Sequence, residues 1–470
     1  MLAWSGALVG AVAIAHPAAS ARAQSLTPRP VVGSPGIRAS GGADDLDSLV
    51  ARALAVNPSV TAAASRLEAT RHRVAPAGAR PDPMLMAGIQ NLPLGRERQL
   101  VSADGVPTGT GGPDPMTMRM IGVGQSIPYP GKLALRRRTA EGEVSAAEAS
   151  LAAAKRRVAY EVKAAYYELV FLDRALDVVE RNQGVLVSFI KVTETRYGVG
   201  IAGQQDVLKA HVEASRLAET AVSLTEQHRA SLARLNAVLN RPSETPLPRP
   251  AIPAPVTRAA VADSGHEIRF VSAALGARVA NSPLPPLAEL QDMAVRESPE
   301  LREHEAMITA QTARVELARK EVLPDFDLSI QYGQRDGRPD MVTATVSVPV
   351  PLQRRRKQDE LVNAAGAELT ALEAEHRGSV NEIRAEVARL VSELERERSH
   401  LALYVKALLP QARASVSSSV ASYQVSRVEF LTVLDNQATV FNYETEYFRV
   451  LSDFAKHVAE LERVVGKEIL

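Results

Sequence analysis

The sequence predicts a mainly α-helical fold with a small β part, arranged as two tandem repeats of about 190 residues each. Two observations support this prediction. Short motifs occur twice in the same order, and within each copy the apolar spacing changes from helical to alternating and back. The matching pairs are LDSLVARALAVNPSV from Leu46 with LAELQDMAVRESPEL from Leu287, Pro81-Asp82 with Pro324-Asp325, QSIPYPGKLALRRR with VSVPVPLQRRRK, and RYGVGIAGQQDVLKA from Arg196 with SYQVSRVEFLTVLDN from Ser422.

Composition divides the chain into five segments. Residues 1–23 hold an apolar stretch of about 14 residues, too short to cross a bilayer, followed by a small-x-small pattern typical of a cleaved secretory signal. Residues 24–45 are rich in Pro, Gly and Ser and predict a flexible lead. Residues 46–240 form repeat 1, residues 241–286 a Pro-rich segment between the repeats, and residues 287–470 repeat 2.

Charge and cysteine content exclude several classes of function. The chain has 55 Lys and Arg residues against 54 Asp and Glu residues, a balance that gives no indication of nucleic-acid binding. The sequence contains no cysteine, which excludes disulfides, thiolate metal sites, a cysteine nucleophile and a lipid-modified N-terminal cysteine.

Each repeat is predicted to contain one long helix and shorter helices of about half its length. Apolar residues recur in steps of three and four after Gly131, as in a coiled coil, and we interpret these stripes as packing seams. The run from Lys132 to Arg196 would be about 98 Å long as a helix, and a matching run extends from Gln353 to about Ser422. Antiparallel helices of this length would build a tube about 100 Å long.

The alternating segments predict strands with one apolar and one polar face. In DFDLSIQYG, Phe326, Leu328 and Ile330 alternate with polar residues, and MVTATVSVP alternates in the same way. Such strands are typical of a membrane β-barrel with an apolar outer surface. Each chain supplies four strands, which cannot close a barrel, so three chains contributing twelve strands are expected.

The Pro-x-Pro motifs lie where each second strand passes into a long helix, and each is followed by a basic run. The basic residues are Arg136, Arg137, Arg138, Arg354, Arg355, Arg356 and Lys357. We expect them in the first turns of the helices, where the macrodipole disfavours cations. Lipid headgroups would favour them there, and the alternative is an ordinary solvated helix face.

Enzyme motifs are weak or missing. GVGIAG matches the dinucleotide fingerprint G-x-G-x-x-G, but it follows a predicted helix and not a strand, so a helix-to-helix turn is favoured. The histidines form no H-E-x-x-H motif, and there is no nucleophile elbow. We therefore predict neither an enzyme nor a bound cofactor.

The duplicated strand–strand–helix plan, the SIPYPGK exit and the turn RYGVGIAGQQDVL resemble the TolC family of outer-membrane efflux proteins over nearly all of the mature chain. The resemblance implies a homotrimer with a twelve-stranded transmembrane barrel in the outer membrane and a periplasmic helical barrel. It also implies outer-membrane lipid, a periplasmic adaptor and an inner-membrane pump as partners. Two departures are the missing acylated cysteine of many relatives and the end at Leu470 soon after the last helix.

The function that follows is a passive outer-membrane channel of a tripartite efflux pump that exports metal cations or small toxic compounds. Two alternatives are a type I protein-secretion duct and a non-channel periplasmic coiled-coil protein. The alternating strands argue against the coiled-coil alternative.

The turns farthest from the membrane are predicted to dock the adaptor, since a partner reaching from the inner membrane meets them first. Their glycines allow close backbone approach and their apolar side chains offer contact area. A plain loop is the alternative. The docking residues are Gly198, Val199, Gly200, Ile201, Gly203, Val425, Arg427, Val428 and Phe430.

The resemblance also implies a gate beside these turns. It places a lock between Asp206 and Tyr423, and acidic rings one and two turns further along the tube. Asp435 matches the inner ring, whereas Thr432 occupies the outer position, so one ring is missing. Three Asp435 carboxylates would favour cations. Alternatively, Asp206 only starts the returning helix, where the dipole favours an acid.

Methionines are predicted on the polar face of the strands: Met84, Met86, Met118 and Met120. Thioethers suit Cu(I) or Ag(I), which makes metal efflux one hypothesis, and the alternative is a less polar lumen without ligands. The PYPGK exit also resembles heavy-metal efflux members of the TolC family.

Overall fold

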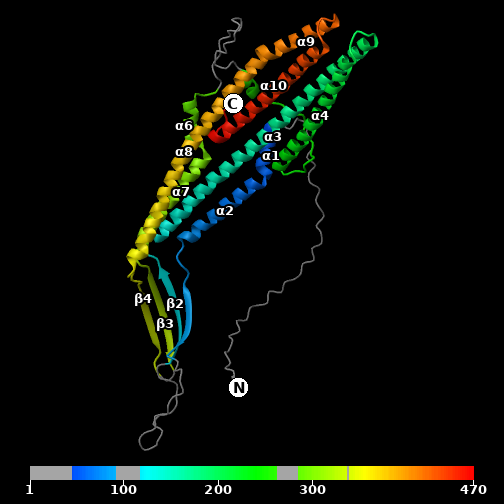
Figure 1. The fold of residues 1–470 in the computed structure, drawn as a ribbon. Coiled ribbons are helices and arrows are strands. Elements are labelled where there is room, and N and C mark those ends of the chain that lie inside the picture. Colours follow the sequence, from blue (N-terminus) through cyan, green and yellow to red (C-terminus); the bar gives the residue numbers. More distant parts are fainter. Residues whose placement is uncertain (1–44, 92–116, 262–283, 336–337, 470) are drawn as a thin grey trace, which may run out of the picture. The chain divides into compact units, whose positions relative to one another are not determined.

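The computed structural model describes residues 45–91, 117–261, 284–335 and 338–469, and the same order of elements occurs twice (Figure 1). The first half comprises α1 (Leu46–Val56), α2 (Pro58–Gly78), β1 (Met84–Gln90), β2 (Met118–Ile127), α3 (Lys132–Gly198) and α4 (Gln204–Val238). The second comprises α6 (Leu287–Glu297), α7 (Pro299–Glu321), β3 (Phe326–Arg335), β4 (Met341–Ser347), η1 (Arg354–Arg356), α8 (Gln358–Leu403), η2 (Tyr404–Leu408), α9 (Leu409–Gln424) and α10 (Phe430–Val465). The helix α5 (Ala254–Val261) lies between the halves. The predicted signal, residues 1–23, lies outside the described residues.

The shorter helices of each half are divided at an X-Pro pair. Asn57 ends α1 and caps α2, because its Oδ1 accepts the N–H of Ser59 at 2.8 Å while Pro58, which lacks an N–H, fills the first helical position. Asn57 also donates from Nδ2 to the carbonyl oxygen of Val238 at 2.9 Å, which joins this break to the end of α4. Ser298 and Pro299 divide α6 from α7 at the matching place, with a proline again at the start of the second helix but without a side-chain cap from Ser298.

The two long helical segments have equal length. The helix α3 has 67 residues. In the second half α8, η2 and α9 follow one another without a break and span the same number of residues. The π-helical turn η2 ends two residues before Pro410, whose missing N–H and bulky ring disturb the regular helix. The predicted start at Gln353 is wrong: α8 begins at Gln358, because η1 comes first.

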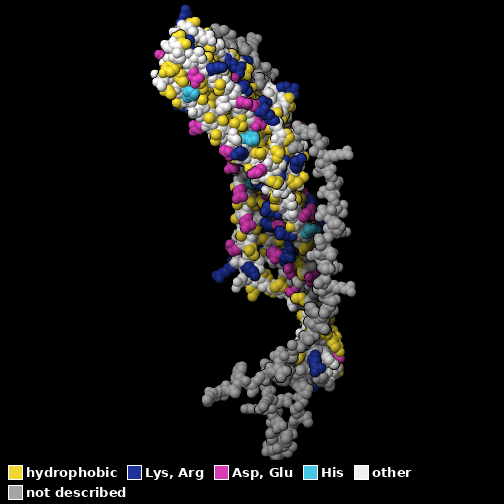
Figure 2. All heavy atoms as spheres, turned by 90° about the vertical axis from the view of Figure 1, so that its right-hand side faces the viewer, with side chains coloured by type: hydrophobic (Ala, Val, Ile, Leu, Met, Phe, Trp, Pro, Cys, Tyr) yellow, Lys and Arg dark blue, Asp and Glu magenta, His cyan; other side chains and the backbone are white. Residues whose placement is uncertain are grey.

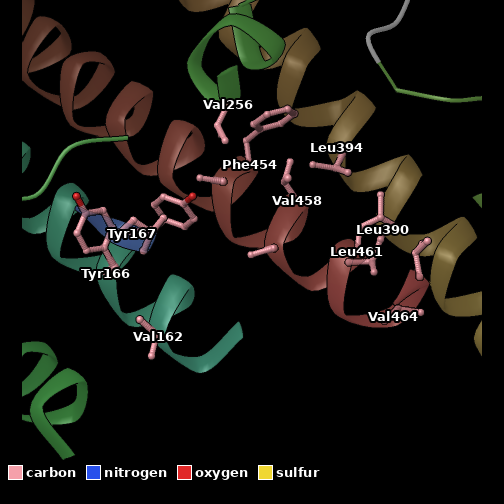
Figure 3. Close-up of a cluster of buried hydrophobic side chains, with 14 of the residues drawn as sticks. Val162, Tyr166, Tyr167, Val256, Leu390, Leu394, Phe454, Val458, Leu461 and Val464 are labelled. Atoms are coloured by element: carbon pink, nitrogen blue, oxygen red, sulfur yellow. The ribbon is translucent and has the colours of Figure 1, made fainter. Parts of the chain in front are cut away.

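The largest buried cluster lies where α3, α8 and α10 meet beside α5 (Figure 3). Its labelled members include Val162, Tyr166 and Tyr167 of α3, Leu390 and Leu394 of α8, Val256 of α5, and Phe454 and Val458 of α10. The hydroxyl of Tyr166 donates to the carbonyl oxygen of Ala251 (3.1 Å) and accepts its N–H (3.0 Å), which attaches the Pro-rich segment to α3. Burying each large apolar side chain stabilises the fold by roughly 1.5–3 kcal/mol.

The four strands form one antiparallel sheet in the order β1-β2-β3-β4. The central pair aligns Ile121 with Tyr332 and Ser126 with Asp327. Among the described residues, β1 and β4 each have a strand partner on one side only, so both are edge strands. This confirms the mainly helical fold with four strands.

Basic and acidic side chains are interspersed along the helices on the face shown in Figure 2. Within the described ranges, no helix combines enough length with enough apolar character to cross a membrane.

Candidate functional site

The sheet has one apolar and one polar face, as the alternation predicts. Opposite residues in neighbouring strands share a face, so the pairing assigns every position. The apolar face carries Leu85, Ala87, Ile89, Ile121, Val123, Leu328, Ile330, Tyr332, Val342, Ala344 and Val346. Leu85 is 75% exposed and Val342 is 69% exposed. Arg119, Gln125 and Gln334 lie on the same face toward its two ends, and the exposed apolar surface between them fits lipid or another protein better than water.

The four predicted methionines all lie on the polar face, together with Met341. The register places Met120 and Met341 on either side of Gly333. Sδ of Met118 would be 3.0 Å from a Cβ on Gly333, so the missing side chain makes room for the thioether. The amide of Gln331 approaches Sδ of Met86 at 4.0 Å. A metal role stays a prediction, and the described residues contain no cluster of His, Cys, Asp and Glu suited to a metal ion.

A buried lysine fastens the exit from β2 to the start of β3. Lys132, the first residue of α3, is 2% exposed. Its ammonium donates to the carbonyl oxygen of Leu323 (2.7 Å) and to Oδ1 of Asp325 (2.7 Å). The same carboxylate oxygen accepts the N–H of Tyr129 at 2.8 Å. These partners are needed because a buried ammonium without them would be strongly destabilising.

The first basic run is paired within the chain. Arg136, Arg137 and Arg138 lie in the second turn of α3. Their carboxylate partners are Glu321 (3.1 Å), Glu141 (2.8 Å) and Glu316 (3.6 Å). The two interhelical pairs connect α3 to α7. An anchoring role at lipid headgroups stays a prediction for this run.

The second basic run lies outside the helix in which it was expected. Arg354–Arg356 form η1, and Lys357 is the N-cap of α8. The first turn of α8 instead carries Asp359 and Glu360, which the helix dipole favours. Arg354 pairs with Asp359 at 3.2 Å, whereas Arg355, Arg356 and Lys357 are exposed.

Both long helices end in the same turn, a Schellman motif. In each turn one residue has a left-handed φ, 77° at Gly200 and 61° at Ser426. Its N–H bonds to the carbonyl three positions earlier, and the next N–H bonds to the carbonyl five positions earlier. The bonds are Gly200 N to Tyr197 O (2.9 Å), Ile201 N to Arg196 O (2.8 Å), Ser426 N to Tyr423 O (2.9 Å) and Arg427 N to Ser422 O (2.8 Å).

The predicted docking residues differ in exposure. Val199 is 65%, Ile201 61% and Val425 63% exposed, whereas Val428 is half-buried. Gly198, Gly203 and Arg427 are exposed as well. Phe430 is only 1% exposed, so its proposed contact with a partner is wrong. Its ring lies 6.3 Å from Phe189 and 5.4 Å from Tyr423, because the first residue of α10 faces a small core between the helices.

The gate residues lie next to this small core. Tyr423 is 7% exposed, and burial together with the nearby Asp206 carboxylate raises the pKa of its hydroxyl. In the described part of the chain that hydroxyl makes no hydrogen bond, so no direct bond joins it to Asp206. Asp206 lies in the first turn of α4, and Thr432 and Asp435 are exposed in the first two turns of α10. Asp435 lines a groove of about 630 Å³ between α4 and α10.

Two cations that hold the repeats together were not identified from the sequence. Arg196 stacks on the ring of Tyr423 at 4.6 Å and donates to the carbonyl oxygen of Gln424 (3.1 Å) and to Oγ of Ser426 (2.6 Å). Lys132 is the other. Both occur in one repeat only, since the matching positions are Ser422 and Gln353. A positive charge that occurs in only one of the two repeats could therefore have identified both residues from the sequence.

Comparison with known proteins defines the class. The protein-family model described as outer membrane efflux protein matches residues 49–241 and 290–467. No curated protein matches the chain. The fold is similar to that of the outer-membrane channel OprN, with TM-score 0.71 and 18% identity over 90% of this chain and 89% of that one. VceC from Vibrio cholerae gives TM-score 0.70 and 18% identity over 90% and 96%. The open state of the MtrE outer membrane channel of Neisseria gonorrhoeae gives TM-score 0.67 and 16% identity over 90% and 89%.

The fold is therefore that of a TolC-like outer-membrane channel. The chain belongs to the outer membrane efflux protein family. It is an efflux channel of the outer membrane that extends into the periplasm, and not an enzyme, as the sequence predicted. The similarities do not select a heavy-metal branch.

Proposed function

We propose that this channel is the exit duct of a tripartite pump, in which a homotrimer receives compounds from a periplasmic adaptor and an inner-membrane pump. The observation that carries the proposal is the four-stranded sheet with one exposed apolar face and two edge strands, continued by long helices that end in exposed turns. Four strands cannot close a barrel, whereas three copies supply twelve. TolC-like channels are trimeric.

Docking of the adaptor is assigned to the exposed apolar residues at the tips, Val199, Ile201 and Val425. Each is more than half exposed next to a tight turn, so a partner can reach both side chain and backbone. Phe430 supports the turn from inside and is not part of this surface.

Loss of the gene should sensitise the cell to compounds that the pump exports, and the intact gene should restore resistance. The double variant Ile201→Asp with Val425→Asp should fail to restore resistance while still forming trimers in the outer membrane. Val222→Asp is the matched control, because Val222 is 65% exposed on α4 but lies away from the turns. If the double variant restored full resistance, the adaptor would have to contact the channel at residues other than Ile201 and Val425. Loss of secretion of one protein, with normal drug and metal resistance, would instead identify a type I secretion duct.

The gate is assigned to the small core beneath the tips. Arg196 of the first repeat holds the second turn through Tyr423, Gln424 and Ser426, so separating these contacts would let α9 and α10 move away from α3. In isolated trimers, Arg196→Gln should raise single-channel conductance, and Asp435→Asn should weaken cation preference. Tyr423→Phe should have little effect, since the hydroxyl makes no bond within the described chain. Conductance and selectivity equal to those of the unmodified protein in the first two variants would remove the gate from this region.

Soft metal cations are one candidate substrate class, supported by five methionines on one face of the sheet. Thioethers bind Cu(I) and Ag(I) and bind harder ions weakly. Replacing Met84, Met86, Met118 and Met120 by Leu should lower copper and silver tolerance and spare organic compounds. Unchanged metal tolerance would assign these methionines to packing over the neighbouring glycines.

A further inference from the structure

The two strand-to-helix junctions of the chain differ in what closes them. In the first, between β2 and α3, Asp325 at the start of β3 accepts the N–H of Tyr129 and the ammonium of Lys132. The junction is closed because β3 is the neighbour of β2 in the same sheet. Every group in this clamp belongs to one chain.

The second junction, between β4 and α8, is open. One residue separates Pro130 from α3, whereas six residues, Leu352–Lys357, separate Pro351 from α8. Leu352 is 91% exposed and Val350 is 73% exposed. In the described part of the chain, no carboxylate pairs with Arg355, Arg356 or Lys357. Apolar and cationic groups are thus exposed together beside an edge strand.

The repeat identifies what this junction lacks. The counterpart of β3 is β1, and the counterpart of Asp325 is Asp82, since each Pro-Asp pair precedes its strand. Asp82 is exposed and has no ion pair in the described chain. It cannot close the β4–α8 junction of its own chain, because β2 and β3 separate β1 from β4. A second copy of the chain can bring its β1 to β4.

The faces of the strands agree with this pairing. Ser126 of β2 lies opposite Asp327 of β3, and their counterparts in the repeat are Ser347 and Met84. The same register places Ala344 opposite Ala87. It also places Val346 opposite Leu85, so apolar residues meet on one face, while Ser347 and Thr345 meet Met84 and Met86 on the other.

We propose that the β4–α8 junction binds a second copy of this chain, whose Asp82 accepts the N–H of Val350 and pairs with the cations of Arg355–Lys357. The proposal rests on the trimer of the proposed function and assigns residues to its interface. Val350 and Leu352 then become buried against the second copy, and the second basic run has a protein partner and not a lipid headgroup.

Charge reversal in the full-length protein tests the ion pair. Asp82→Arg should lower the fraction of protein that stays trimeric in mild detergent by about tenfold or more, as expected for loss of a desolvated charge pair. Adding Arg355→Glu, Arg356→Glu and Lys357→Glu to that variant should restore the trimer. Asp292→Arg is the matched control, because Asp292 is exposed on α6.

A trimer unaffected by Asp82→Arg would overturn the proposal. The variant that reverses only the three cations gives a second test. If it formed intact trimers but associated less with the membrane, the basic run would be assigned to lipid headgroups and the proposal would be overturned. If the unmodified protein formed no trimers, the proposed function would fail as well, which separates the two failures.

Thiol crosslinking tests the strand pairing independently. The chain has no cysteine, so Ala87→Cys with Ala344→Cys introduces the only two thiols. Within one chain these positions lie three strand spacings apart, about 14 Å, which exceeds the reach of a disulfide. A bifunctional thiol reagent that spans well under about 14 Å should give covalent dimers and trimers, and either single variant should give no trimers. Absence of covalent trimers from an assembled double variant would contradict the pairing.

Discussion

The two repeats form the same turn at their tips and both turns are exposed, yet only the second is flanked by buried aromatic side chains. Gly200 and Ser426 occupy the same left-handed position, with the same two backbone hydrogen bonds. Around Ser426 the chain is held by Arg196, Tyr423 and Phe430. The first turn, by contrast, leaves the side chains of Val199 and Ile201 exposed.

This difference separates the geometry of a turn from its role. The Schellman bonds satisfy the last carbonyls of the helix, and any residue that tolerates a positive φ can form them. The surrounding side chains then decide whether the turn is supported from inside or available to a partner. We therefore propose docking at both tips, through Val199 and Ile201 in the first turn and Val425 in the second, and gate support only beneath the second turn.

The largest expected effect on this comparison comes from Phe430→Ala. Removing a buried aromatic ring from the small core beneath the second turn should destabilise that region by about 3–5 kcal/mol. Ile201→Ala in the exposed first turn should change stability by less than about 0.5 kcal/mol. Hydrogen exchange of α9 and the start of α10 would measure the loss. Equal exchange in both variants would show that the two turns are equivalent after all.

The second effect compares the two junctions. Asp325→Asn leaves the ammonium of Lys132 buried without a countercharge, which should cost about 3 kcal/mol of chain stability. Asp82→Asn should leave the stability of a single chain unchanged and weaken only the trimer. Denaturant unfolding and trimer retention, measured on both variants, separate these outcomes. Similar losses of chain stability would show that Asp82 already has a partner within its own chain.

A smaller effect is expected from the left-handed residues. Gly200→Ala forces a side chain into a left-handed conformation and should cost about 1 kcal/mol. Ser426→Ala replaces one strained residue by another, so only the bond from Arg196 to Oγ is lost. Thermal unfolding should therefore show the larger decrease for Gly200→Ala, and the reverse order would mean that the Arg196 bond dominates.

The smallest effect concerns histidines that join the long helices to the returning ones. His457 bonds to Glu397 at 2.8 Å, and this bond, with Glu393 and Glu460 nearby, raises the pKa of the imidazole. Its contribution to stability is present below the ordinary pKa of about 6.5 and is lost as pH rises through the raised folded value. His457→Gln should remove this pH dependence, worth about 1 kcal/mol or less. His228→Gln at the His228–Asp173 pair of the first repeat is the matched control, and unfolding curves on both sides of neutral pH provide the measurement.

The sequence by itself determined the repeat, the order of the elements and the two faces of the strands. These features depend on local periodicity, because a period of two in a strand, or of three to four residues in a helix, determines which side chains share a face. The sequence pattern predicted the two faces around Ile330, the helix divisions at Pro58 and Pro299, and the matching turns at the tips of the two repeats. The start of α8 did not, because nothing in the run Arg354–Lys357 distinguishes a 3₁₀ turn from the first turn of an α-helix.

Only the tertiary structure decided which side chains face a partner within the chain. Periodicity identified Phe430 and Ile201 equally as apolar residues beside a turn, and nothing in the pattern singled out Lys132 among the cations near the start of the same helix. Phe430 and Lys132 are buried because helices distant in sequence, or the start of β3, lie over them. Burial depends on which distant segments pack over a residue, and the pattern along one segment cannot contain that information.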